Sequence, residues 1–339
     1  MHLTQLLRHC IQKNASDLHI APLKPPVLRI DGDLEAMEAW GSLDADTTKQ
    51  LVRQSMSEAE FHQFETEWEL DYAMQLRDGS RFRVNACHHQ TGTGAVFRMI
   101  PTRVPTWEQL GLPETFKKLL TLQSGLILVT GASGSGKSTT LAAMLDEINR
   151  HASLHVITLE DPIEFIHVSQ KSVMTQREVH RDTRSFDKAL RSAMRQDPDI
   201  ILLGEMRDPE TIRLALTAAE TGHLVMATLH TRGASSAISR IVDVFPANEK
   251  EMIRHLLAES LQAVICQTLV KAKQGGRVPA FEILLGTPAV RHLIREDKAA
   301  QMVSAMQTGG AHGMCTLSQY LQNLVTKQII DATMTSDCF

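Results

Sequence analysis

Eight residues from Gly131 to Ser138 read GASGSGKS and match the phosphate-binding loop pattern G-x-x-x-x-G-K-[ST]. Glycines in such a loop let the backbone turn tightly and aim its N–H groups at phosphate oxygens, and the following helix adds the positive end of its dipole. Lys137 is expected to reach the β- and γ-phosphates, and the Ser138 hydroxyl to bind Mg²⁺. The expected nucleotide-binding residues are Gly131, Ala132, Ser133, Gly134, Ser135, Gly136, Lys137, Ser138 and Thr139.

The segments on both sides of this loop favour nucleotide binding over the alternative of a glycine-rich turn with a surface lysine. The preceding GLILVT is a short apolar run typical of a buried strand, and the following TTLAAMLDEINR has apolar residues at helical spacing. Strand, loop and helix therefore come in the order that the motif requires. The expected ligands are ATP and Mg²⁺.

From about Pro113 the sequence predicts strands that alternate with helices, and hence a mostly parallel sheet with helices on both faces. In such sheets ligands bind outside the carboxyl ends of the strands. After the strand that leads into the loop, the expected strands are His155 to Glu160, Asp199 to Glu205 and His223 to His230. The chemistry beyond the loop should therefore come from residues at the ends of these three strands.

Those strand ends carry carboxylates and an imidazole. Glu160, Asp161 and Glu164 follow the second strand, Glu205 closes the third, and His230 closes the fourth. A nucleotide hydrolase needs carboxylates here for Mg²⁺ and for the attacking water. The alternatives are that Asp161 caps a helix and that His230 is structural.

His223 has no predicted share in this site. It stands seven residues before His230, so in a regular strand it lies at the opposite end and on the opposite face.

Hydrolysis also needs positive charge that stabilises the negatively charged transition state, in addition to the charge of Lys137. Arg81 and Arg83 are two residues apart and therefore lie on the same face of a predicted strand, and Arg98 closes the next strand. One interpretation is that these are solvated edge arginines. The other is that they are arginine fingers that reach a nucleotide held by a neighbouring subunit.

Length and composition predict two globular domains. Residues 1–100 indicate a small α+β domain, residues 101–112 a linker rich in proline, and residues 113–339 an ATPase domain that is largely helical after about Ser235, apart from the strand-like VPAFEILL.

No apolar run approaches the roughly 20 residues of a membrane span, and the first 20 residues lack the apolar stretch of a signal peptide. The expected location is the cytoplasm.

The net charge, the aromatic content and the spacing of the cysteines argue against nucleic acid binding, a zinc site and a disulfide framework. A net charge of −4 and 4% aromatic residues argue against nucleic acid binding. The cysteines show no C-x-x-C pair, which argues against a zinc site and a disulfide framework; they are Cys10, Cys87, Cys266, Cys315 and Cys338.

Four long motifs resemble, in order, those of the hexameric secretion and type IV pilus ATPases, and within them the twitching-motility retraction ATPases. They are the loop GASGSGKSTTLAAM, the acidic box ITLEDPIEF, the Walker B region QDPDIILLGEMRDPETI and the histidine box TAAETGHLVMATLHT. The likeness covers nearly the whole chain, including SDLHI and RFRVNA.

The resemblance implies a PAS-like first domain, a RecA-like second domain and a ring of six identical subunits. It implies that Glu164 polarises the attacking water, that Glu205 has the Walker B role with Mg²⁺, and that His230 lies at the γ-phosphate. Arg98 and one of Arg81 and Arg83 would reach across to the neighbouring subunit. Glu205 follows Gly204, where many such ATPases have Asp-Glu, so direct metal ligation by an aspartate is not expected here.

The resemblance favours pilus retraction over assembly. Assembly ATPases of this family usually carry a four-cysteine zinc motif, which this sequence lacks, and retraction ATPases carry A-I-R-N-L-I-R-E, to which AVRHLIRE at 289–296 is similar. Val290 and His292 depart from those letters, and an ordinary amphipathic helix with Val290, Leu293 and Ile294 buried is the alternative.

The implied function is an ATP-driven motor at the cytoplasmic face of the inner membrane. It would act on a membrane platform protein, with a paralogous pilus ATPase as a further candidate partner. Two other functions stay open. One is a nucleotide-binding regulatory subunit of a pilus or type II secretion ring without effective motor activity. The other is a soluble P-loop kinase, but no segment of the sequence resembles the lid over the acceptor substrate that such a kinase needs.

Overall fold

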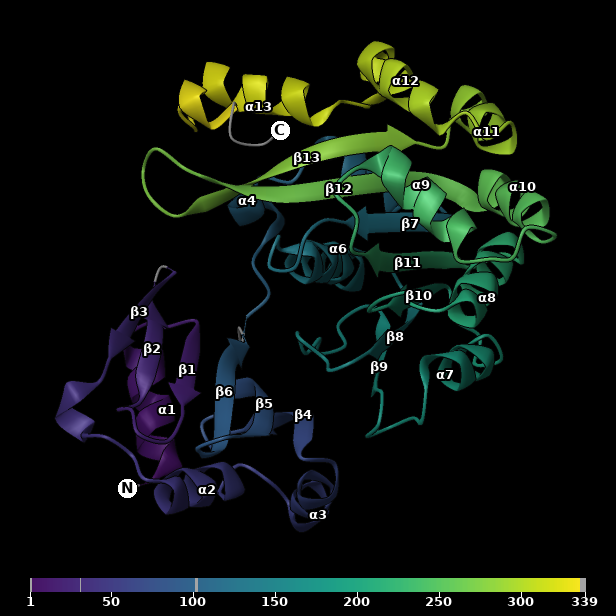
Figure 1. The fold of residues 1–339 in the computed structure, drawn as a ribbon. Helices are drawn as coiled ribbons and strands as arrows, with labels where there is room; N and C mark the ends of the chain where they lie inside the picture. The colour runs from purple at the N-terminus through teal and green to yellow at the C-terminus, as the bar shows by residue number, and fades with distance from the viewer. Residues whose placement is uncertain (1, 31, 101–102, 336–339) are drawn as a thin grey trace. The chain divides into compact units, whose positions relative to one another are not determined.

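The computed structural model describes residues 2–30, 32–100 and 103–335. The chain divides into two compact units, Met1–Arg103 and Val104–Phe339 (Figure 1). Within the described residues, no helix is both long and apolar enough to cross a lipid bilayer.

The first unit is built on a six-stranded antiparallel sheet with strand order β3-β2-β1-β6-β5-β4. Its strands are β1 (Asp17–Ile20), β2 (Val27–Ile30), β3 (Asp33–Ala36), β4 (Glu69–Gln75), β5 (Arg81–His89) and β6 (Gly92–Ile100). Its helices are α1 (Leu3–Gln12), α2 (Ala45–Arg53) and α3 (Glu58–Glu67), with a 3-10 turn η1 (Glu38–Trp40).

Strand register separates an apolar row from a charged row in this sheet. Leu18, Phe97 and Val84 are paired across β1, β6 and β5, and all three are buried beneath the helices. The adjacent row pairs Asp17 with Arg98 and Arg98 with Arg83. Because side chains alternate between the faces of a sheet, this charged row points away from the helix-covered core.

The structure confirms the predicted strand that carries Arg81 and Arg83 as β5, and the next strand, which carries Arg98, as β6. Ser57 and Glu60 form a capping box that fixes the start of α3. Strands β1, β2 and β3 were not predicted from the sequence. Each is four residues long, too short for an alternating pattern to stand out.

The second unit is built on a seven-stranded sheet with strand order β13-β12-β7-β11-β10-β8-β9. Its strands are β7 (Gly125–Thr130), β8 (His155–Glu160), β9 (Val173–Glu178), β10 (Ile200–Leu203), β11 (Leu224–Leu229), β12 (Leu261–Lys271) and β13 (Arg277–Leu285). All neighbouring pairs are parallel except β12 with β13. The prediction of a mostly parallel sheet is therefore confirmed.

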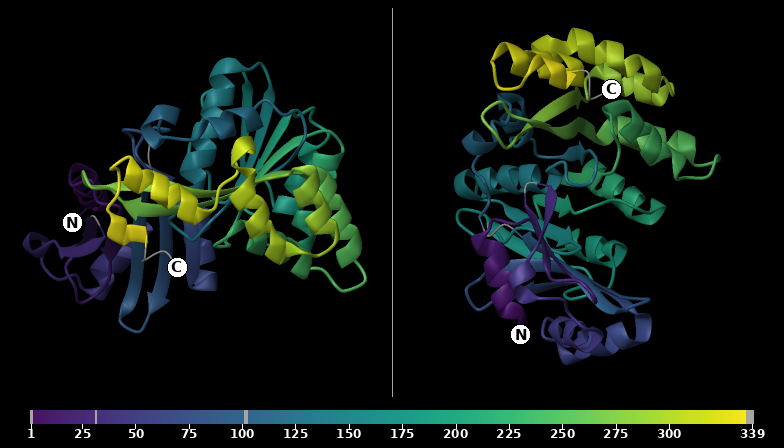
Figure 2. Two further views of the ribbon diagram at one scale, coloured as in Figure 1. Left: turned by 90° about the horizontal axis from the view of Figure 1, so that it is seen from above. Right: turned by 60° about the vertical axis from the view of Figure 1, so that its left-hand side comes forward.

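Helices cover both faces of this sheet (Figure 2). Alternate residues of β7 show the two cores, since Leu126 and Leu128 face one helix layer, whereas Ile127 and Val129 face the other. The helices are α4 (Trp107–Leu110), α5 (Glu114–Leu119), α6 (Lys137–His151), α7 (Phe186–Ala193), α8 (Pro209–Glu220), α9 (Ala234–Asp243), α10 (Lys250–Ser260), α11 (Pro288–Arg295), α12 (Met302–Thr308) and α13 (Leu317–Thr326). Short 3-10 turns are η2 (Ala299–Gln301), η3 (Gly309–His312) and η4 (Ala332–Thr335).

After Ser235 the chain is largely helical, as predicted, and the strand-like VPAFEILL lies in β13, but the structure adds a strand that was not predicted. Strand β12 follows α10 without a break and runs for eleven residues, pairing with β7 on one side and β13 on the other. Its pairing partner β7 lies more than 130 residues earlier, so the choice of strand over helix depends on contacts that local sequence does not carry. Strand β10 is also shorter than predicted.

Part of the predicted linker packs into the second unit. Residues 101–102 lie outside the described residues, but Trp107 and Leu112 are buried, and the Trp107 indole N–H donates to the Leu112 carbonyl at 3.1 Å. The description of the first unit as PAS-like stays a prediction.

The cysteines Cys10, Cys87, Cys266 and Cys315 are free thiols, and Cys338 lies outside the described residues. Within the part of the chain that is described, no group of three or more His, Cys, Asp or Glu is arranged to hold a metal.

Candidate active site

The phosphate-binding loop joins the end of β7 to the start of α6, as predicted. Gly131 has φ of 144°, and a Cβ there would lie 2.3 Å from the carbonyl oxygen of Gln267. Gly136 has φ of 88° and is the N-cap of α6. Both positions require glycine, because a side chain would be strained at either and would clash at Gly131. The loop therefore has the local geometry that the motif predicts.

Lys137 is folded onto this loop. Only 7% of the residue is exposed, and its ammonium donates to the carbonyls of Gly131 at 3.0 Å and Ala132 at 2.9 Å. Burial lowers the pKa of Lys137, while the carboxylates of Glu164 and Glu205 act in the opposite direction. The Lys137 ammonium is thus close enough to interact electrostatically with both predicted catalytic carboxylates, those of Glu164 and Glu205.

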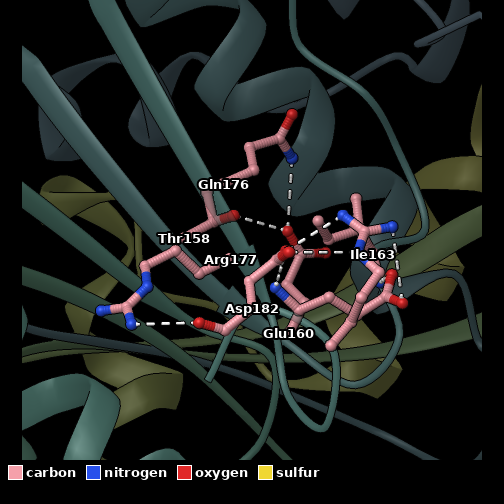
Figure 3. Close-up of polar contacts among 8 residues, drawn as sticks. Thr158, Glu160, Ile163, Gln176, Arg177 and Asp182 are labelled. Carbon is pink, nitrogen blue, oxygen red and sulfur yellow. Dashed lines mark hydrogen bonds and ion pairs between the residues drawn. The ribbon is translucent and has the colours of Figure 1, made fainter.

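Glu160 ends β8 and is held by three donors, of which Thr158 and Gln176 are labelled in Figure 3. Its carboxylate accepts from the Thr158 hydroxyl at 2.7 Å and from the Gln176 amide at 3.4 Å, and its second oxygen accepts from the backbone N–H of Glu164 at 3.4 Å. Burial raises the pKa of Glu160 to about 7, although these hydrogen bonds oppose the shift. Glu160 therefore fixes the backbone that presents Glu164.

The segment after Glu160 is an irregular loop. Residues 161–172 contain no helix, so the alternative that Asp161 caps a helix is wrong; the Asp161–Pro162 peptide bond is cis. The edge strand β9 holds this loop, because Gln176 accepts from the His167 N–H at 2.7 Å and donates to the Phe165 carbonyl at 2.8 Å. Glu178 accepts from the Ile163 N–H at 3.0 Å.

Glu205 and His230 lie side by side at the ends of neighbouring strands. One oxygen of the largely buried Glu205 carboxylate is 2.7 Å from the Arg207 guanidinium, and the other is 3.7 Å from Nε2 of His230. Burial lowers the pKa of His230, the positive charge of Lys137 lowers it further, and Glu205 opposes both. The protein environment therefore favours the neutral form of the imidazole.

These contacts bring Lys137, Glu164, Glu205 and His230 together at one edge of the sheet, in agreement with the strand-end argument. Ser138 lies in the first turn of α6 and, with Glu160 and Gly204, lines a small pocket at the same edge. His223 lies at the other end of β11, where its Nδ1 contacts the Ala218 carbonyl at 3.0 Å. The structure thus separates His223 from His230.

The three predicted arginines lie in the first unit. Arg98 Nε donates to Asp17 at 2.8 Å, and Arg83 Nε lies 3.9 Å from Asp71. Arg81 is only 8% exposed, so the alternative of a solvated edge arginine is wrong for this residue. Their action on a nucleotide stays a prediction.

Sequence reasoning missed two glutamines that support the site. Gln176 on β9 holds the loop that carries Glu164, and Gln267 on β12 contacts the phosphate-binding loop. Both lie on strands that were not predicted. A single glutamine, whether in the apolar run of β12 or in the mixed segment of β9, has no spacing or motif that marks it in advance.

Comparison with known proteins agrees with this geometry. Residues 1–280 match the family described as type II/IV secretion system protein. The chain is 55% identical over 330 residues to the type IV pilus retraction ATPase PilT of Pseudomonas aeruginosa, covering 97% of this chain and 96% of that protein. It is 50% identical over 321 residues to a twitching motility protein of Neisseria gonorrhoeae, covering 94% and 85%.

A solved structure is similar over the full length. The crystal structure of the pilus retraction motor PilT with bound ADP superimposes with a TM-score of 0.90 at 42% identity, covering 100% of this chain and 97% of that one.

Proposed function

The chain belongs to the type II/IV secretion system protein family, and from this premise we propose that it hydrolyses ATP to drive the retraction of a type IV pilus. One observation carries the proposal. A complete phosphate-binding loop, two carboxylates and an imidazole meet at one sheet edge in a chain that is 55% identical to a retraction ATPase.

The residues at this edge fit ATP with Mg²⁺. Glycine at 131 keeps side chains out of the loop, and the Ser138 hydroxyl and Glu205 carboxylate are oxygen ligands of the kind that Mg²⁺ prefers. These two residues would hold the ion, which when bound neutralises charge on the β- and γ-phosphates. Lys137 would supply a further cation to the same phosphates.

Glu164 and His230 have separate proposed roles. Glu164 is presented by a loop that is tied to Glu160 and β9, so its carboxylate is suited to orient the attacking water. The lowered pKa of His230 favours its neutral form, which can donate one hydrogen bond to a γ-phosphate oxygen.

The arginine fingers require more than one subunit. We propose a homo-hexamer in which Arg98 and Arg83 of one subunit act on the nucleotide of its neighbour, consistent with their place on the charged row of the first unit. The motor would work at the cytoplasmic face of the inner membrane on a platform protein, with a paralogous ATPase as a further candidate partner. These assignments rest on the family resemblance.

Two measurements test the proposal. Purified wild-type protein should hydrolyse ATP, and Glu205→Gln should lower turnover to background, because the carboxylate charge is lost while the shape is kept. A strain that lacks the gene should carry more surface pili and lose twitching motility. Background turnover in the wild type would support the accessory-subunit alternative, and unchanged pili in the deletion strain would refute retraction.

A further inference from the structure

Gln267 is a fully buried polar residue on β12 that touches the phosphate-binding loop. Only 3% of it is exposed. Its amide nitrogen donates to the Ser135 carbonyl at 2.8 Å, and its amide oxygen accepts from the Thr140 hydroxyl at 2.8 Å. The side chain therefore links the middle of the loop to the first turns of α6.

The register of the sheet explains why this residue reaches the loop. Strand β12 is parallel to β7, and Cys266 is paired with Thr130, the last residue of β7. Gln267 is thus the first residue of β12 beyond the end of β7, level with Gly131. Its own carbonyl oxygen lies so close to Gly131 that a Cβ there would come within 2.3 Å.

Gly136 lies against the same side chain. A Cβ at Gly136 would come within 2.9 Å of the Gln267 amide nitrogen. One residue, more than 125 positions away in the sequence, therefore contacts the beginning, the middle and the end of the loop.

We propose that Gln267 is a positioning residue that holds the phosphate-binding loop in its binding conformation. The inference rests on the proposed nucleotide site. A loop with glycine at 131, 134 and 136 has high conformational freedom, so ordering it around a phosphate costs entropy unless something outside the loop fixes it. The Gln267 amide, which lies outside the loop on β12, holds the Ser135 carbonyl by a hydrogen bond.

An apolar residue at this position cannot replace the amide. Without it, the Ser135 carbonyl and the Thr140 hydroxyl both lose a buried partner, which favours other loop conformations. The expected consequence is weaker nucleotide binding, because part of the binding free energy is then spent on ordering the loop.

The chain offers a matched control on the same strand. Gln262 also donates its amide to a backbone carbonyl, that of Ser124 at 3.2 Å, but at the other end of β7. Gln267→Met and Gln262→Met each remove one amide from β12 and keep a similar side-chain volume, the Gln262 amide being only partly buried. Only the first change touches the loop.

The experiment measures the dissociation constant of a fluorescent ADP analogue for the purified full-length variants, together with their thermal midpoints. Gln267→Met should weaken binding roughly tenfold, because two buried hydrogen bonds to the loop and α6 are lost, and Gln262→Met less than about twofold. Equal weakening in both variants, or unchanged binding in Gln267→Met, would overturn the proposal.

Thr140→Val gives a second test that does not depend on how well Gln267→Met folds. It removes only the hydroxyl, so it should weaken binding by a few fold in the wild type and by much less in the Gln267→Met background. Full additivity of the two changes would count against a shared link to the loop. Wild-type protein that binds ADP without hydrolysing ATP would refute the ATPase proposal but leave this comparison decisive.

Discussion

The guanidinium of Arg98 is held by the carboxylate of Asp17, with Nε 2.8 Å from Oδ1. The Asp17 side chain is 5% exposed and also accepts from the Ser16 hydroxyl at 2.7 Å, whereas the Arg98 side chain is 66% exposed. A buried, doubly bonded carboxylate therefore anchors an exposed cation. This arrangement lowers the entropy that Arg98 would lose on meeting a phosphate.

Arg98→Ala should lower ATP turnover at least a hundredfold, because an arginine finger acts on the transition-state charge. Binding of the fluorescent ADP analogue should change little, since the loop in the same subunit is intact. Arg29→Ala is a suitable control, because Arg29 is paired with Asp17 across β1 and β2 but donates to the Gly32 carbonyl. Equal loss of turnover in both variants would indicate a structural role.

Mixed rings test whether the arginines act between subunits. Arg83→Ala and Lys137→Ala proteins should each be inactive, since one lacks a proposed finger and the other lacks the loop cation. Mixing them should restore part of the turnover, because some interfaces then combine an intact loop with an intact arginine. No recovery in rings that are shown by mass to be mixed would contradict an inter-subunit site.

Lys137→Ala should abolish turnover and weaken ADP binding while leaving the fold intact. The ammonium contacts only loop carbonyls within the described residues, and burial already lowers its pKa, so its charge adds little to stability. Circular dichroism and the thermal midpoint should match those of the wild type within a few degrees. Retained turnover would refute the site assignment.

Glu160 should make stability depend on pH. Its pKa is raised from 4.5 to about 7 in the folded protein, so between these values the folded state binds more protons than the unfolded state. The free energy of unfolding should therefore fall as pH rises from about 4.5 to 7, by on the order of 2 kcal/mol. Glu160→Gln has no titratable group here, and urea titrations across this range should show the fall in the wild type only.

The nucleotide-binding half of the site could be predicted because it is local. The loop, the strand before it and the helix after it are consecutive, and Glu164, Glu205 and His230 stand at the ends of strands whose apolar runs are visible. Parallel pairing then brings those ends to one edge.

The supporting residues could not be predicted because they depend on pairing across the sheet. Gln267 lies on β12, which becomes a strand through β7 and β13, and Gln176 lies on β9, an edge strand of mixed burial. The same limit applies to Arg98, whose buried partner Asp17 is 81 residues away.

Helix α11 and its C-cap residue Glu296 carry the segment AVRHLIRE, which contains two arginines. Val290 and Ile294 are buried, as predicted for an amphipathic helix, Leu293 is partly buried, and Arg291 is partly buried as well. Its guanidinium donates to the Gly286 carbonyl at 2.8 Å and to the Ala258 carbonyl at 2.7 Å, and it also contacts the Glu259 carbonyl. Arg291 therefore satisfies carbonyls in the last turn of α10.

The two arginines should consequently behave differently. Arg291→Ala leaves carbonyls of α10 without their donor and should lower the free energy of unfolding by about 1–3 kcal/mol. Arg295 forms an ion pair with Glu259 at 2.9 Å, an exposed partner, so Arg295→Ala should cost less than about 1 kcal/mol. Urea titrations of the two variants should show this order.

Arg295→Ala is therefore the cleaner test of whether α11 transmits work to the pilus. If the helix acts in transmission, this variant should keep ATP turnover within a few fold of the wild type and yet give hyperpiliated, non-motile cells. His292→Asn, at an exposed position of the same helix, is the control and should retract normally. Normal motility in Arg295→Ala would limit α11 to a structural role. Loss of turnover together with motility would instead assign the helix to the catalytic machinery, reached through α10 and the start of β12.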